Sequence, residues 1–144
     1  MTQPANNAAA AIRVMKYLLS QCREEAEAAI LKLQEDAAKS PSHLFEWGQN
    51  YYHPFMRMRI ANRIQAAYDE NAAGYDENDP IADRDRWFDA LSREIKTLTE
   101  TLTRNRLAAR SSSAFSNACT EVEREASADM LRDLEGIYSF FAKA

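Results

Sequence analysis

Glycine and proline are scarce in this chain, since its 144 residues include only 3 Gly and 4 Pro. The tight turns between β-strands depend on these two residues, so the composition disfavours an all-β fold. The three glycines are scattered, which excludes a glycine-rich loop that could hold a nucleotide phosphate. No apolar run approaches the ~18 residues of a membrane span, and the N-terminus lacks the basic start of an export signal.

Cysteine and histidine are equally rare, with 2 of each. Cys22 and Cys119 match no metal-binding or redox spacing; we expect reduced core thiols, with one disulfide as the alternative, and a cytoplasmic location. His43 and His53 are ten positions apart, too far to share an ion on one helix, and neither completes a Glu-x-x-His motif. We therefore expect no metal and no cofactor.

The remaining composition is that of a single globular domain over residues 1–144. Hydrophobic residues make up 46% of the chain and charged residues 28%. The net charge of −4 disfavours a protein whose whole surface grips nucleic acid, although a local basic patch is compatible with it.

Four segments have helical periodicity, and none has the pattern of a strand; the expected helices cover 5–38, 41–73, 80–110 and 114–142. In the first and third segments, apolar residues alternate in steps of three and four. These two stripes are Ile12, Met15, Leu19, Cys22, Ala26, Ala29 and Leu33, and Phe88, Leu91, Ile95, Leu98, Leu102, Asn105 and Ala109. Short connections predict an all-α antiparallel four-helix bundle or a similar helical assembly, and two narrow stripes also allow a homodimer.

The second expected helix contains a proline in its interior. Pro54 has no N–H to donate, and its ring clashes with the carbonyl group four residues earlier, at Asn50. We therefore expect a kink or a short break between Asn50 and His53.

The same helix is rich in aromatic and arginine side chains. An apolar face can be built from Trp47, Tyr51, Phe55, Met58, Ala61, Ile64 and Tyr68, with Tyr52, Met56 and Ile60 off it. One interpretation buries this face in the core, with the arginines reaching solvent. The other is a partner-binding surface, because Tyr, Trp and Arg dominate interface hot spots. That surface consists of Trp47, Tyr51, Tyr52, His53, Arg57, Arg59 and Arg63.

No constellation of residues suggests catalysis, so the leading hypothesis is a non-catalytic interaction protein, such as a small regulator, inhibitor or assembly subunit. An alternative is a helical subunit that contacts nucleic acid within a larger complex. Its support is the arginines of the second helix together with a second cluster, Arg104, Arg106 and Arg110. An enzyme would rest only on His53 and the tyrosines near Pro54.

Overall fold

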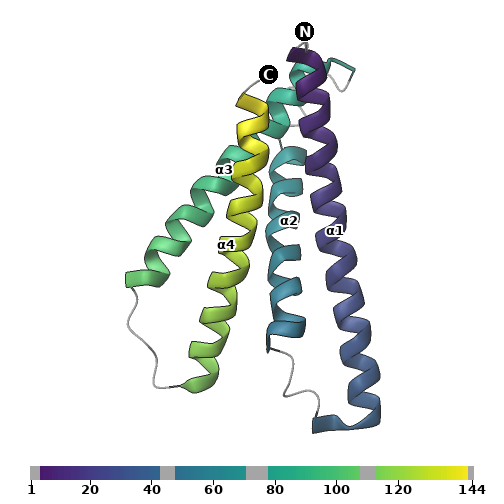
Figure 1. Ribbon diagram of the computed structural model, residues 1–144, viewed down its shortest axis with the longest axis vertical. Coiled ribbons are helices and arrows are strands. Elements are labelled where there is room, and N and C mark those ends of the chain that lie inside the picture. Colours follow the sequence, from purple (N-terminus) through teal and green to yellow (C-terminus); the bar gives the residue numbers. More distant parts are fainter. Residues whose placement is uncertain (1–3, 43–47, 71–77, 108–112, 143–144) are drawn as a thin grey trace.

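The computed structural model describes residues 4–42, 48–70, 78–107 and 113–142. Within these ranges the chain forms four α-helices and no strand: α1 (Pro4–Lys39), α2 (His53–Glu70), α3 (Pro80–Leu107) and α4 (Ala114–Ala142). A short π-helix, η2 (Gly48–Tyr52), leads into α2. Successive helices run in opposite directions, and both ends of the chain lie at one end of the molecule (Figure 1). The predicted all-α antiparallel bundle is confirmed.

α3 begins at Pro80 and α4 at Ala114, the positions predicted from the sequence, and each start follows a capping side chain. The carboxylate of Asp79 accepts a hydrogen bond from the N–H of Ile81 at 3.0 Å, and Pro80 takes the first helical position, where its missing N–H costs little. The hydroxyl oxygen of Ser113 accepts a hydrogen bond from the N–H of Ser116 at 3.2 Å. These contacts satisfy N–H groups that a helix start leaves unpaired.

The second helix differs from its predicted span of 41–73, because its α-helical part begins only at His53. Residues 43–47 lie outside the described residues, as does Gly74, which we expected to end this helix. The bend expected at Pro54 stays a prediction. What the structure adds is η2, whose i→i+5 hydrogen bonds place one extra residue in the turn and so change the direction of the side chains that follow.

The buried face of α2 matches the predicted one only in part: Ala61 and Ile64 are buried as expected. Met56 and Ile60, which we placed off the apolar face, are buried, whereas Phe55 is 38% exposed and Met58 is half-buried. The predicted face assumed an unbroken α-helix from residue 47 onward. A π-helical turn ahead of His53 breaks that register, and the prediction is wrong at Phe55 and Met58, in the first turns beyond it.

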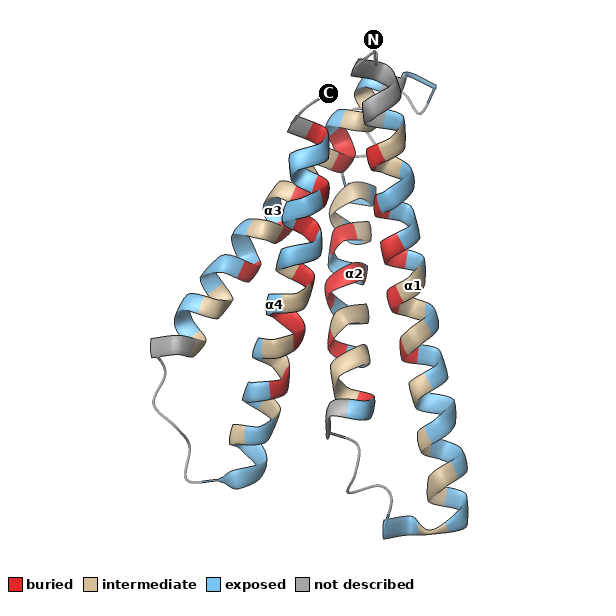
Figure 2. Ribbon diagram, viewed as in Figure 1, coloured by how far each residue is buried: buried red, intermediate tan, exposed pale blue. Residues whose placement is uncertain are grey.

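The core lies mainly towards the end of the bundle that carries the termini (Figure 2). On α1 the predicted stripe is buried at Met15, Leu19, Cys22 and Ala26, and no described residue from 27 to 39 is buried. The sixteen residues of the core cluster are Ala11, Met15, Leu18, Leu19, Cys22, Ile60, Ala61, Ile64, Trp87, Ala90, Leu91, Leu98, Met130, Leu134, Ile137 and Phe141.

The stripe of α3 is only partly buried. Leu91 and Leu98 are fully enclosed, but Ile95 and Leu102, which we also expected to be buried, are half-buried. The reason is visible in Figure 1, where α3 diverges from the other helices towards its C-terminal end.

Candidate functional site

The tyrosines of the predicted partner-binding surface point into the molecule. Tyr51 is 7% exposed, and its hydroxyl donates to the Asp36 carboxylate of α1 at 2.8 Å. Tyr52 donates to the Glu123 carboxylate of α4. Burial and then this hydrogen bond raise the pKa of Tyr52 well above its usual value. Both hydroxyl groups therefore connect the start of the second helical segment to neighbouring helices.

His53 and Arg57 form a ladder of polar contacts with α4. The Nε2 atom of His53 lies 3.0 Å from Asp129, and Nη2 of Arg57 lies 3.3 Å from Asp133. Both pairs advance by four residues on each helix, as expected for α2 and α4, which run in the same direction (Figure 1). Arg57 also reaches α1, where its Nη1 lies 3.4 Å from Glu25. This single guanidinium thus bridges α1, α2 and α4.

Arg63 makes the corresponding contact with α3. Its Nε and Nη2 atoms donate to one carboxylate oxygen of Glu94 at 2.9 and 2.6 Å. The side chain of Glu94 is 7% exposed. Desolvation raises the pKa of Glu94 above its usual value, and the nearby Arg63 charge opposes that rise.

The predicted partner-binding surface is therefore largely occupied by contacts within the chain. Arg59 is the exposed exception, with its Nη1 3.8 Å from the sulfur of Met56 and no carboxylate at ion-pair distance within the described ranges. Trp47 lies outside the described residues. Of the second arginine cluster, Arg104 is exposed, while the side chain of Arg106 and the whole of Arg110 lie outside the described part. A basic strip shared by both clusters stays a prediction.

The described residues include no candidate metal-binding cluster, and their two cysteines are isolated thiols. No group of three or more His, Cys, Asp or Glu residues there could hold a metal ion. Both cysteines are free thiols; Cys22 is buried, and burial raises the pKa of its thiol. Its sulfur lies 3.7 Å from that of Met130.

Among the described helices, none has the length and apolarity that crossing a membrane requires.

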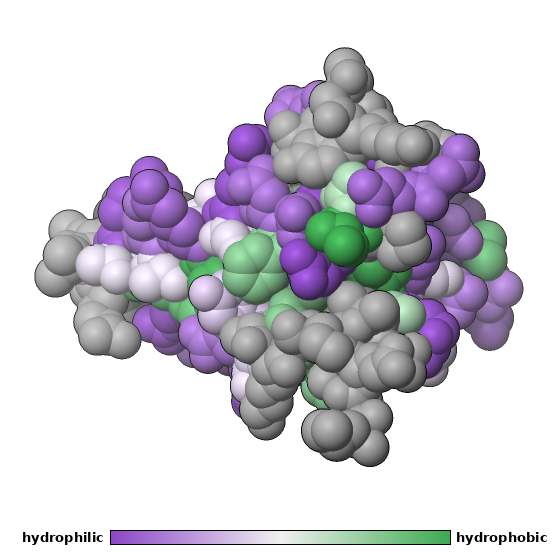
Figure 3. All heavy atoms as spheres, turned by 90° about the horizontal axis from the view of Figure 1, so that it is seen from above, coloured by the Kyte–Doolittle hydropathy of each residue, from purple (hydrophilic) through white to green (hydrophobic). Residues whose placement is uncertain are grey.

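Sequence reasoning missed an apolar groove between α1 and α4, which we term the α1–α4 groove. It encloses about 160 Å³ and is lined by Ala11, Val14, Asp133, Gly136, Ile137 and Phe140. Val14 is 50% exposed and Phe140 is 46% exposed. Seen from the end that carries the termini, the molecule has hydrophobic side chains open to the surface among hydrophilic ones (Figure 3). The sequence signal that could have indicated this groove is that Val14 and Phe140 are apolar but lie beside the buried stripes of α1 and α4.

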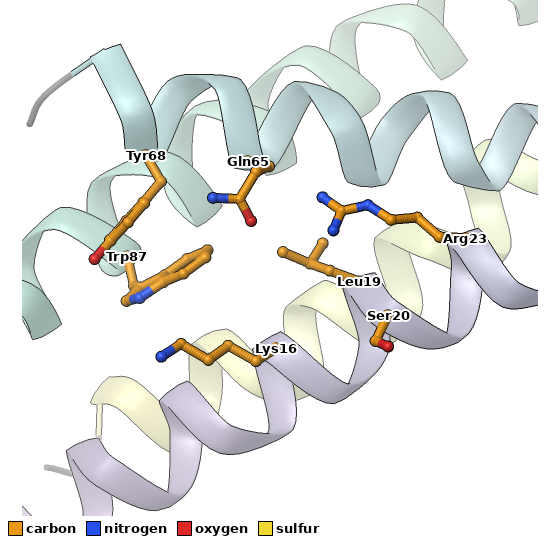
Figure 4. A pocket seen from close by; sticks show the side chains of 7 residues that line it. All are labelled: Lys16, Leu19, Ser20, Arg23, Gln65, Tyr68 and Trp87. Atoms are coloured by element: carbon orange, nitrogen blue, oxygen red, sulfur yellow. The ribbon is translucent and has the colours of Figure 1, made fainter.

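A second hollow, which we term the basic pocket, lies between α1, α2 and α3 (Figure 4). It measures about 270 Å³ and is lined by Lys16, Leu19, Ser20, Arg23, Gln65, Tyr68 and Trp87. Among the described residues, its lining contains two cationic side chains and no carboxylate. No sequence motif indicates the basic pocket, because its residues come from three helices that are distant in the chain.

Comparisons of the chain with protein-family models, with curated proteins and with solved structures gave no match.

Proposed function

We propose that this chain is a non-catalytic helical protein that binds another protein through the α1–α4 groove. The supporting observation is a hollow at the surface whose rim, Val14 and Phe140, stays about half exposed although both residues are strongly apolar. Large apolar side chains gathered round a concave surface are typical of protein-binding sites. Tyr17 lies one turn beyond Val14 on α1, is 68% exposed, and extends this surface.

Gly136 is the most informative residue of the groove. Glycine in a helix interior costs roughly 1 kcal/mol relative to alanine. Among the described residues no packing contact requires this glycine, because a Cβ atom there would meet none of their atoms within 4 Å, and its backbone has no positive φ. A residue that weakens its helix while keeping a hollow open is consistent with a site that receives a partner side chain.

Gly136 also supplies a steric test. Gly136→Ala should raise the free energy of unfolding by about 0.5–1 kcal/mol, and Gly136→Leu should fill the groove while preserving the fold. Urea titration followed by circular dichroism measures both effects. A loss of stability in Gly136→Ala would show that the space is not open and would remove the argument from this residue.

The partner itself can be captured with a photo-crosslinking amino acid placed at Tyr17 in the native cell. The matched control carries the same amino acid at Glu27, an exposed position of α1. We expect one protein to be crosslinked from position 17 and not from position 27, and its purified form to lose binding to Gly136→Leu and Val14→Asp. Equal crosslinking from both positions, or unchanged binding to both variants, would contradict the proposal.

A further inference from the structure

We propose that the basic pocket binds a small organic oxyanion, a phosphate or a carboxylate, held by Lys16, Arg23 and the indole N–H of Trp87. This inference is independent of the proposed function, because the basic pocket and the α1–α4 groove share no residue. Three observations on the described residues carry it: two cations without anionic partners there, a buried donor without an acceptor there, and a stacked aromatic wall.

The first observation is the charge of the lining. Lys16 and Arg23 lie seven positions apart on α1, so both face the same hollow two turns apart. Neither has a carboxylate at ion-pair distance among the described residues, in a chain whose net charge is −4. Arg23 is oriented by a hydrogen bond of 3.4 Å to the amide oxygen of Asn62, which leaves its charge uncompensated. Such a pair of cations attracts an anion into the pocket.

The second observation is the indole nitrogen of Trp87. This side chain is 2% exposed, and its Nε1 has no hydrogen-bond acceptor within the part of the chain that the structure describes. A buried N–H without an acceptor is unfavourable, and native proteins rarely leave one unpaired. Figure 4 shows the nitrogen edge of the indole on the side of the pocket where the Lys16 ammonium group ends. An oxyanion seated at this end of the pocket accepts from the indole N–H and from the ammonium group of Lys16.

The third observation is the rigidity of the wall behind this donor. Tyr68 stacks on Trp87 with ring centroids 3.9 Å apart, and the guanidinium of Arg86 lies 3.8 Å from the centroid of Tyr68. Arg86 also donates to the backbone carbonyl of Tyr68 at 2.7 Å, which fixes this layer. The donor is thus held in place before a ligand arrives, and this lowers the entropy lost on binding.

The amide of Gln65 indicates what else the ligand carries. Its nitrogen donates to Asp69 outside the pocket at 3.1 Å, and its oxygen points into the pocket in Figure 4. That oxygen accepts hydrogen bonds and repels anions, so it suits a hydroxyl group on the ligand. The chemistry therefore fits a hydroxylated organic acid or a phosphate ester better than a bare ion.

The test is an NMR titration of the indole N–H of Trp87. The chain has 2 Trp, so in a Trp47→Phe background one indole signal remains in a ¹H–¹⁵N spectrum. We expect this signal to shift and saturate on addition of citrate or inorganic phosphate at low chloride concentration. Lys16→Gln and Arg23→Gln should each raise the apparent Kd about tenfold, as the loss of one charge-assisted contact predicts.

Lys32→Gln is the matched control, because it removes the same charge from an exposed position of α1 outside the pocket. It should leave the Kd unchanged. The absence of saturation below ~10 mM for both probes would overturn the proposal, as would an equal weakening by Lys32→Gln. The probe that saturates at the lower concentration distinguishes a carboxylate ligand from a phosphate ligand.

Discussion

Arg57 and Arg63 show how the setting of a side chain determines its role. The sequence marks them as candidates for partner recognition, because arginines among aromatic residues are typical of interfaces. In the structure they face Glu25, Asp133 and Glu94 on three other helices. Their positive charges offset carboxylates that the fold brings close to α2, so we expect a structural role for both.

The double variant Arg57→Glu, Arg63→Glu tests that role. It replaces attraction by repulsion at both contacts, and we expect the free energy of unfolding to fall by about 3 kcal/mol. This is the lower end of the range for a broken buried pair, because Arg63 is 46% exposed and solvent screens its contribution. Arg104→Glu, Arg124→Glu makes the same change of charge at exposed positions and should cost under ~0.5 kcal/mol per site. Equal thermal midpoints for the two variants would instead favour a recognition role for Arg57 and Arg63.

The raised pKa of Glu94 predicts that the stability of the fold depends on pH. Its pKa in the folded chain lies above the usual 4.5, chiefly because burial disfavours the charged form. Between these two pKa values the folded chain holds a proton that the unfolded chain has released. The contribution of Glu94 to stability is therefore complete below pH 4.5 and declines as the pH rises through the folded pKa.

The corresponding measurement compares wild type with Glu94→Gln by urea denaturation at several pH values. The stability of wild type relative to Glu94→Gln should decrease as the pH rises above 4.5. Glu100→Gln, at an exposed position of the same helix, should give a difference that does not change with pH. A relative stability of wild type that increases over this range would contradict the assignment.

At the scale of helices, periodicity predicts burial well where a helix is regular and packed along its length. All six apolar positions of α4 that step mostly by four are buried: Val122, Ala126, Met130, Leu134, Ile137 and Phe141. The predictions are wrong where the geometry departs from a packed α-helix. In the first turns after η2 the buried positions of α2 differ from the expected ones, and towards the end of α3 the expected core positions are half-buried.

The substitution Leu98→Ala tests how much the packing of α3 contributes to the free energy of unfolding. This residue is 0% exposed and belongs to the core cluster. Leu98→Ala should lower the free energy of unfolding by about 2–5 kcal/mol, because it removes buried methyl groups and leaves a cavity. Leu31→Ala, at a leucine of α1 that is 59% exposed, should change stability by under ~0.5 kcal/mol. A cost below half a kilocalorie for Leu98→Ala would mean that the helix pairing is wrong.

At the scale of the whole molecule, the open question is self-association. The homodimer predicted from the two heptad stripes stays a prediction. Much of both stripes packs within one chain, so a dimer would use surface that the fold leaves exposed, such as the α1–α4 groove.

Sedimentation at micromolar concentration tests the dimer. A species of twice 16.4 kDa in wild type that becomes 16.4 kDa in Gly136→Leu would make the groove the contact between copies. Only a 16.4 kDa species in wild type would remove the dimer and leave the groove to a different protein.

The sequence by itself determined the helical class, most helix boundaries and the antiparallel order. These follow from local information: the spacing of apolar residues and the scarcity of turn-forming residues. Only the tertiary structure decided that Arg57 and Arg63 have carboxylate partners, that Trp87 is a buried donor, and where the two hollows lie. The physical reason is that each of these features is a meeting of side chains from helices distant in sequence, and helical periodicity carries no information on which residues of separate helices come into contact.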